Sequence, residues 1–180
     1  MTSTILVAGI GNIFLGDDGF GPEVVRRLVA EGGAGAPEAA DGVRIVDYGI
    51  RGMHLAYDLL DGCGTLVLVD AVPGDGPPGA VDVLEVDADS ISAAARDGRA
   101  GLDAHSMDPV AVLSGVTALG GELPPTYVVG ARPQDLDEGI GLSEPMAAAV
   151  PVAVDAVRTL LTRLRQPAPE PDVRPVREVI

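Results

Sequence analysis

The sequence contains very little cysteine and few basic side chains for its length. Its one cysteine, Cys63, excludes an internal disulfide and any cysteine-rich zinc site. We expect this thiol to be small and buried. Twelve Lys and Arg residues stand against 27 Asp and Glu residues, which gives a formal net charge of -15. This charge disfavours nucleic acids and anionic membranes as partners and favours a basic or cationic one.

Long apolar segments are also missing. The apolar runs have the length of strands, well below the roughly 20 residues of a membrane-spanning helix, and the first residues lack the regions of a signal peptide. We therefore expect a cytoplasmic protein without a membrane partner. The chain has 180 residues and no linker-like composition in its middle, so we predict one domain over residues 1–165. A disordered tail is predicted over residues 166–180, which hold Pro167, Pro169, Pro171 and Pro175.

The short motifs of common hydrolases are not found. There is no H-E-x-x-H sequence, no G-x-S-x-G sequence and no phosphate loop with a lysine, and Cys63 has no suitable histidine partner. These absences argue against an ordinary self-sufficient protease.

Strand-like and helix-like patterns alternate along the chain. Strands are predicted over residues 4–10, 43–48, 65–70, 80–86 and 126–131. Helices are predicted over residues 21–30, 53–60, 109–119 and from a cap at Ser143 to about Leu164. The alternation predicts a single-domain α/β sandwich, with a mostly parallel, twisted five-stranded sheet and helices on both faces. The fourth strand should be antiparallel and lie beside the third, because residues 73–79 are too few for a helical crossover.

A glycine-rich turn with two adjacent carboxylates follows the first predicted strand. Residues 9–21 read GIGNIFLGDDGFG. Such a turn usually binds a pyrophosphate through backbone amides and a helix N-terminus. Here Phe14 stands where a third glycine is required, and Asp17 and Asp18 would repel a phosphate. The turn therefore suits a cation better than an anion.

Two further side chains are expected at the same edge of the sheet. If the strand order is 2-1-3, ligands bind outside the carboxyl ends of the first and third strands. Asp70 ends the third strand, and His105 lies shortly before a predicted helix. Two carboxylates and one imidazole can bind a metal and leave coordination positions open. The alternative roles are structural: a helix cap for Asp17 or Asp18, a turn for Asp70 and a hydrogen bond at a helix start for His105.

The segment after the second predicted strand offers a possible recognition loop. Gly49 and Gly52 predict a tight turn, and Arg51 between them can present a cation to a carbonyl or carboxylate. Its alternative is an ordinary surface arginine. Asp47 lies too far along the chain to act as the ribose-binding acid of a dinucleotide fold. His54 is expected to face solvent.

Four segments together resemble the hydrogenase maturation endopeptidases, which trim the C-terminus of the large subunit of nickel-iron hydrogenases. They are GIGNIFLGDDGFGPEVV, DYGIRGMHLAYDLL, LVLVDAVPG and AHSMDPVAVL. The sequence VVGARPQDLDEGIGLSEPM is similar to the family's last strand and helix. The resemblance extends over nearly the whole chain to about residue 164.

The resemblance implies a function and a set of site residues. Asp18, Asp70 and His105 correspond to the residues that contact the metal in this family, and they are expected to act in catalysis. The metal would be nickel already inserted in the hydrogenase large-subunit precursor, with no tightly bound metal of the protein's own. The expected activity is that of a nickel-dependent endopeptidase that processes the C-terminus of this precursor.

By the same resemblance, Gly49, Arg51 and Gly52 match a substrate-recognition loop. The residues alone leave other functions open. One is a nucleotide- or cofactor-binding α/β protein, another is a magnesium-dependent hydrolase, and a third is an inert chaperone that docks on the precursor.

Overall fold

A computed structural model describes residues 4–86 and 109–166. The strands are β1 (Ile5–Ile10), β2 (Val43–Gly49), β3 (Thr65–Ala71), β4 (Val81–Val86) and β5 (Thr126–Ala131). The helices are α1 (Phe20–Glu31), α2 (Gly52–Leu60), α4 (Pro109–Ala118) and α5 (Glu144–Arg165), with short 3-10 turns at Gly16–Gly19 and Pro37–Ala39. Every predicted strand and helix is present, with its ends shifted by about one residue. The predicted tail lies outside the described residues except for Gln166, and His105 also lies outside them.

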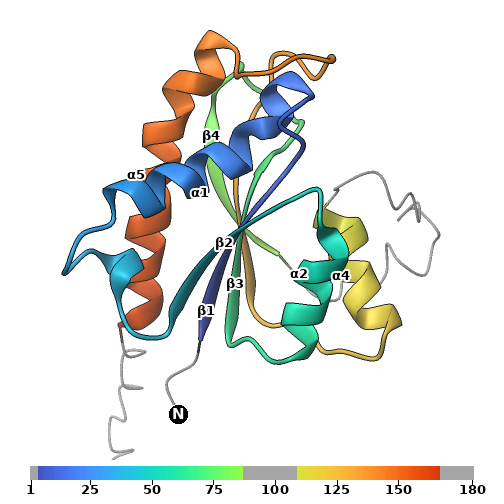
Figure 1. Ribbon diagram of the computed structural model, residues 1–180, viewed down its shortest axis with the longest axis vertical. Helices are drawn as coiled ribbons and strands as arrows, with labels where there is room; N and C mark the ends of the chain where they lie inside the picture. Colours follow the sequence, from blue (N-terminus) through green and yellow to red (C-terminus); the bar gives the residue numbers. More distant parts are fainter. Residues whose placement is uncertain (1–3, 87–108, 167–180) are drawn as a thin grey trace, which may run out of the picture.

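The five strands form one sheet in the order β2-β1-β3-β5-β4. Strand β1 pairs in parallel with β2 and β3, and β3 pairs in parallel with β5. Strand β4 is antiparallel to β5. Figure 1 shows the sheet nearly edge-on, with α1 and α5 on one side and α2 and α4 on the other. The predicted α/β sandwich, with a mostly parallel sheet and one antiparallel strand, is confirmed.

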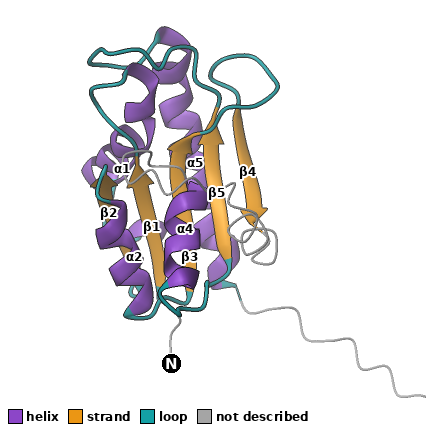
Figure 2. Cartoon of the chain, turned by 90° about the vertical axis from the view of Figure 1, so that its right-hand side faces the viewer, coloured by secondary structure: helices purple, strands orange, loops and turns teal. Residues whose placement is uncertain are grey.

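The predicted neighbour of β4 is wrong, because β5 lies between β3 and β4. Figure 2 shows β4 as the outer strand, pointing opposite to β1, β3 and β5. The segment between β3 and β4 crosses the end of β5 and bonds to it. The amide of Val72 donates to the carbonyl of Ala131 at 2.9 Å, and the amide of Gly79 donates to the carbonyl of Arg132 at 2.8 Å.

The side chain of Arg132 explains why this crossing is stable. Its guanidinium donates to the carbonyls of Val72 and Asp75, each at 3.3 Å, and to Asp82 Oδ2 at 2.7 Å. One side chain at the end of β5 therefore binds both ends of the crossing segment. Strands β3 and β4 therefore do not have to pair with each other. Arg132 and the end of β5 form hydrogen bonds with the backbone of the segment that joins them.

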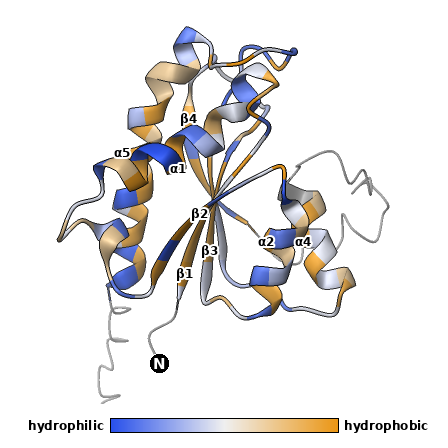
Figure 3. Ribbon diagram, in the orientation of Figure 1, coloured by the Kyte–Doolittle hydropathy of each residue, from blue (hydrophilic) through white to orange (hydrophobic). Residues whose placement is uncertain are grey.

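Two apolar cores lie on the two faces of the sheet. The α1 and α5 side buries Val7, Phe20, Leu28, Val69, Met146 and Leu161, among others. The α2 and α4 side buries Leu6, Ile10, Leu55, Leu68 and Leu113, among others. Full burial of such a side chain contributes about 1.5–3 kcal/mol, so these faces supply much of the stability. Figure 3 shows hydrophobic and hydrophilic colours on both α1 and α5, as expected for helices with one buried side.

Helix α5 is long and apolar enough to cross a membrane by length and composition alone. However, its buried residues recur at intervals of three and four and belong to the core beside the sheet: Met146, Ala149, Val150, Ala153, Val154, Val157, Leu160 and Leu161. In this fold it is the core helix that covers one face of the sheet.

Helix α1 begins in direct contact with the ends of two strands. A Cβ atom on Gly21 would lie 2.3 Å from the carbonyl oxygens of Ile10 and Val69. A Cβ atom on Gly9 would lie 2.6 Å from the carbonyl oxygen of Gly21. Only glycine permits so close an approach of backbone to backbone. The start of α1 is therefore held against the carboxyl ends of the paired strands β1 and β3, where the strand order reverses.

Candidate functional site

The two carboxylates of the glycine-rich turn have different environments. Asp17 is fully buried, with 0% of its surface exposed, whereas Asp18 is partly exposed. The residue pattern alone treats them as equivalent candidates and the family resemblance selects Asp18, whereas the structure gives them different surroundings.

Asp17 binds the loop between β5 and α5. Its Oδ2 accepts hydrogen bonds from the amides of Gln134 at 2.8 Å and Asp135 at 2.9 Å, and its Oδ1 accepts from the amide of Ser143 at 2.7 Å. The Ser143 hydroxyl also donates to Oδ2 at 2.9 Å. Ser143 stands at the predicted N-cap of α5, but its side chain does not cap the helix. Asp17 is thus a structural residue that joins two loops at the carboxyl edge of the sheet.

The ionised form of Asp17 is the stable one in the folded protein. Burial raises the pKa of Asp17, but the amides of Ser143, Asp135 and Gln134 and the Ser143 hydroxyl outweigh it and lower the pKa below its ordinary value. A carboxyl whose pKa is lower in the folded than in the unfolded state stabilises the fold above its unfolded pKa. That contribution is lost as the pH falls through the folded pKa.

Replacement of Asp17 by asparagine should test this role. Asparagine brings an NH₂ group toward donors and removes the charge, so we expect a loss of about 2–4 kcal/mol in the free energy of unfolding at pH 7. The difference from the unmodified protein should shrink below about pH 4. Urea titrations at both pH values measure it, and Asp137→Asn, on an exposed residue of the same edge, is the matched control. Equal stability of the two variants at pH 7 would contradict the structural role.

Asp18 is oriented by its own loop. Its Oδ2 accepts a hydrogen bond from the amide of Asn12 at 2.6 Å. In the part of the chain that the structure describes, no hydrogen bond reaches its other carboxylate oxygen. Gly11 lies against the Asp18 backbone: its φ is +132°, and a Cβ atom there would lie 1.9 Å from the Asp18 carbonyl oxygen. The glycine therefore permits the turn that presents the Asp18 side chain.

Asp70 lies next to the end of β3 and is 4% exposed. Its Oδ1 accepts a hydrogen bond from the amide of Ala71 at 2.8 Å. Side chains alternate along a strand, so Asp70 shares the sheet face of Leu68, which belongs to the core beside α2 and α4. It follows Val69, whose carbonyl contacts the start of α1.

The start of α1 shows that both acids lie at the same edge of the sheet. Asp18 precedes Gly21 by three residues, and Gly21 contacts the carbonyls of Ile10 and Val69. Asp18 and Asp70 therefore lie at the same strand-order reversal, as the sequence predicts for a ligand site.

His105 is the third predicted residue of this set and lies outside the described residues. The next helix along the chain is α4, on the sheet face that Asp70 shares. Within residues 4–86 and 109–166, no three His, Cys, Asp or Glu side chains gather as metal ligands. The predicted three-residue set requires His105, so its role stays a prediction.

The predicted recognition loop is folded back on itself. Arg51 donates from Nε to the carbonyl of Tyr48 at 3.0 Å and from Nη2 to the carbonyl of Asp47. Gly49 has a φ of +52°, and its carbonyl accepts a hydrogen bond from the amide of Gly11 at 3.1 Å. Gly52 is the first residue of α2. These contacts join the loops after β1 and β2, and a substrate-binding role for the three residues stays a prediction.

Two other residues singled out in the sequence lie away from this edge or face solvent. His54 is exposed on α2, as predicted. Cys63 is only partly buried, contrary to the prediction, because it lies in the short turn before β3. Its thiol donates to the carbonyl of Thr65 at 3.0 Å, and burial raises the pKa of the thiol.

The sequence reasoning missed the loop between β5 and α5. This loop contains Gln134, Asp135 and Ser143, which hold Asp17. The signal that could have found it is its position after a parallel strand, because all parallel strands end at the ligand-binding edge.

Comparison with known proteins agrees with this fold and sequence pattern. A sequence profile of the HycI hydrogenase maturation protease family matches residues 23–160. A putative hydrogenase maturation protease of Methanocaldococcus jannaschii is 30% identical over 157 residues, covering 85% of this chain and 93% of that protein. The hydrogenase expression/formation protein HupD of Rhizobium leguminosarum bv. viciae is 32% identical over 158 residues, covering 87% of this chain and 73% of that protein.

Solved structures give the same result. A hydrogenase 2 maturation peptidase from a Thaumarchaeota archaeon is 31% identical, with a TM-score of 0.64, over 88% of this chain and 98% of that one. The hydrogenase maturating endopeptidase HybD of Escherichia coli is 26% identical, with a TM-score of 0.70, over 90% of this chain and 94% of that one. The profile match and these relatives show that the chain belongs to the hydrogenase maturation protease family, whose members are endopeptidases.

Proposed function

We propose that this protein removes a C-terminal peptide from the nickel-loaded large-subunit precursor of a nickel-iron hydrogenase. The observation that carries the proposal is the position of Asp18 and Asp70, in a chain of this family, at the edge where the strand order reverses. The reaction would be hydrolysis of one peptide bond. The hydroxyl of water joins the carbonyl carbon, and its hydrogen joins the leaving nitrogen.

The donor atoms suit a nickel ion carried by the substrate. Carboxylate oxygen and imidazole nitrogen both bind divalent nickel. Asp18 is partly exposed, and only one of its carboxylate oxygens accepts a hydrogen bond within the described chain. Asp18, Asp70 and His105 would hold the ion while the precursor supplies the remaining ligands. We assign no resident metal to the protein.

Binding of the ion by these residues would fix the C-terminal segment of the precursor beside them. Fixing a scissile bond in a reactive orientation can contribute a large part of catalysis. A carboxylate not committed to the ion can accept a proton from the attacking water. A precursor without nickel would lack the contact that orients it, so cleavage would report that the metal has been inserted. A cytoplasmic location for this step stays a prediction.

The glycine-rich turn does not favour the alternative of nucleotide binding. The amide of Asn12 donates to Asp18, that of Phe14 to the Asn12 side chain at 3.0 Å, and that of Gly16 to the carbonyl of Gly139 at 3.0 Å. An anion cradle needs backbone amides that point at the ligand. These amides already have partners within the protein.

The experiment that tests the proposal uses the large-subunit precursor produced by the same organism, prepared with and without nickel. We expect mass spectrometry to show loss of a short C-terminal peptide from the nickel-loaded precursor and none from the nickel-free one. Intact nickel-loaded precursor after prolonged incubation would overturn the proposed activity. Equal cleavage of both forms would retain the activity and overturn the recognition of nickel.

A further inference from the structure

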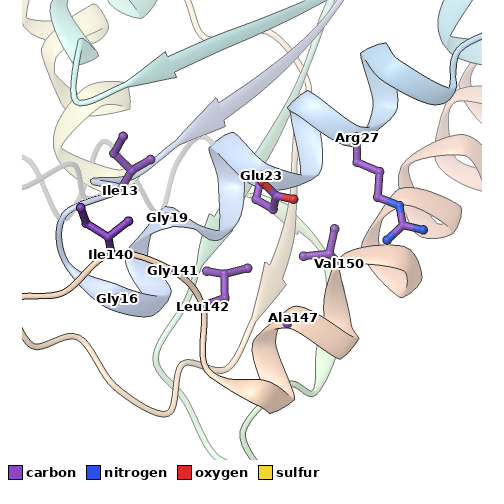
Figure 4. Close-up of a pocket in the computed structure, with 10 residues that line it drawn as sticks. All are labelled: Ile13, Gly16, Gly19, Glu23, Arg27, Ile140, Gly141, Leu142, Ala147 and Val150. Atoms are coloured by element: carbon purple, nitrogen blue, oxygen red, sulfur yellow. The ribbon is translucent and has the colours of Figure 1, made fainter.

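A cleft lies beside the candidate site, on the face of the molecule that α1 and α5 cover. Its volume is about 400 Å³, and its walls come from the turn before α1, from α1 itself, from the loop before α5 and from the first turns of α5. Figure 4 shows Ile13 and Ile140 at one end, Leu142, Ala147 and Val150 along one side, and Glu23 and Arg27 toward the other end. The lining is thus mainly apolar.

The residues at the end of the cleft nearest the site are unusually exposed for their type. Ile140 is 83% exposed and Ile13 is 51% exposed. The backbones that carry them are held together, because Leu15 and Gly139 form a bridge and the amide of Gly139 donates to the carbonyl of Phe14 at 2.9 Å. Apolar side chains held in water on rigid backbone are typical of a surface that a partner covers.

The cleft borders the turn that carries Asp18, because Gly16 and Gly19, on either side of Asp17 and Asp18, both line it. A chain that lies in the cleft and leaves it past Ile13 therefore passes the loop that presents Asp18. The polypeptide that must approach this edge in a protease is its substrate.

The charges around the cleft favour a basic partner. Asp137 and Glu138 are exposed and precede Ile140, the first residue of this loop that lines the cleft, with only Gly139 between. Within the cleft, Arg27 donates to Glu31 at 2.6 Å and Glu23 accepts from Arg26 at 2.8 Å, so both charges of the lining are already paired. The whole chain also has a net charge of -15. Opposite charges at a rim increase the rate of association and select the partner.

We propose that this cleft binds an apolar segment of the hydrogenase precursor that is flanked by basic side chains. The inference rests on the proposed function, because it identifies the substrate as the occupant. It adds a second recognition element, separate from the nickel ion, that selects the precursor by the apolar side chains and charges of its own sequence.

A bulky side chain in the cleft tests the inference. Ala147 is exposed and lines the cleft, whereas Ala148, the next residue of α5, is exposed and does not line it. We expect Ala147→Trp to raise KM for the nickel-loaded precursor by about 10-fold or more, since burial of one large apolar side chain is worth that factor. Its kcat should stay within about twofold, as for loss of uniform binding. Ala148→Trp should leave both constants within about twofold.

A variant that removes two charges beside the cleft provides a second test of the inference. In Asp137→Asn/Glu138→Gln, we expect KM to rise and its dependence on salt concentration to weaken, because the screened attraction is removed. Glu122→Gln is the control, since Glu122 is exposed and lies before β5, at the opposite edge of the sheet.

Several results would overturn the inference. One is an unchanged KM in Ala147→Trp when the unmodified protein cleaves the precursor. Another is a loss of kcat at constant KM, which would place the effect on the chemistry. A third is a result from analytical ultracentrifugation. If the unmodified chain sediments as a dimer and Ala147→Trp as a monomer, the cleft is a self-association surface.

Failure of the proposed function would be distinguishable from failure of the cleft. If the unmodified protein binds the nickel-loaded precursor but does not cleave it, calorimetric affinities of Ala147→Trp and Ala148→Trp still compare the two positions. A roughly 10-fold weaker affinity for the first alone would support the cleft. Equal affinities, or no binding by the unmodified protein, would overturn it.

Discussion

Replacement of Asp18 or Asp70 by asparagine is expected to lower kcat/KM for the nickel-loaded precursor by about 100-fold or more, the loss typical of removing one preorganised polar group from an active site. Asparagine retains an oxygen that can accept the Asn12 amide at position 18 or the Ala71 amide at position 70. What it removes is the negative charge that would bind the ion or accept a proton. The melting temperature of Asp18→Asn should therefore change little while activity is lost.

The matched control is Asp47→Asn. Asp47 is exposed near the end of β2, at the same edge of the sheet, so its variant has the same change of net charge. We expect its kcat/KM to stay within about twofold, because an exposed charge outside the site is largely screened by solvent. Normal cleavage by Asp18→Asn or Asp70→Asn would remove that residue from the proposed site.

Replacement of Gly21 by alanine is expected to cause the largest loss of stability. The new Cβ atom would lie 2.3 Å from the carbonyl oxygens of Ile10 and Val69, which belong to the carboxyl ends of the inner strands β1 and β3. These atoms cannot move aside without breaking strand pairing, so we expect a loss of about 3 kcal/mol or more in the free energy of unfolding. Urea unfolding followed by circular dichroism measures it.

Gly115→Ala is the control for this experiment. Gly115 lies within α4, and a Cβ atom there would meet no atom within 4 Å. Alanine in a helix interior is favoured over glycine, so this variant should gain about 0.5–1 kcal/mol. If Gly21→Ala and Gly115→Ala change the free energy of unfolding by the same amount, the close backbone contact at Gly21 does not require glycine.

Most of the fold could be predicted from local patterns. The buried strands β1, β3 and β5 are short apolar runs, and α5 has apolar residues at intervals of three and four. The direction of β4 followed from the short segment before it. Its neighbour did not, because β5 comes about 40 residues later in the chain and supplies the hydrogen bonds to that segment.

The sheet edge at which Asp18 and Asp70 lie could be predicted from the sequence, whereas their part in a site stays a prediction. Asp18 and Asp70 lie where the strand order predicts a ligand. The residue pattern alone could not separate Asp17 from Asp18, although the family resemblance selects Asp18, because the difference is made by Ser143 and Gln134, far along the chain. The sequence also could not show that the Arg51 side chain donates to its own backbone, because an arginine that faces solvent in a loop has the same sequence signal.

The bonds of Asp17 also determine when this region is completed during synthesis. Asp17 and Asp18 leave the ribosome early, but the groups that hold Asp17 belong to Gln134, Asp135 and Ser143. A nascent chain that ends before residue 143 already contains the loop with Asp17 and Asp18. It still lacks the Ser143 amide and hydroxyl that bind the Asp17 carboxylate. The loop that presents Asp18 can take its final form only after nearly the whole domain has been translated. An incomplete chain should therefore be unable to cut a precursor.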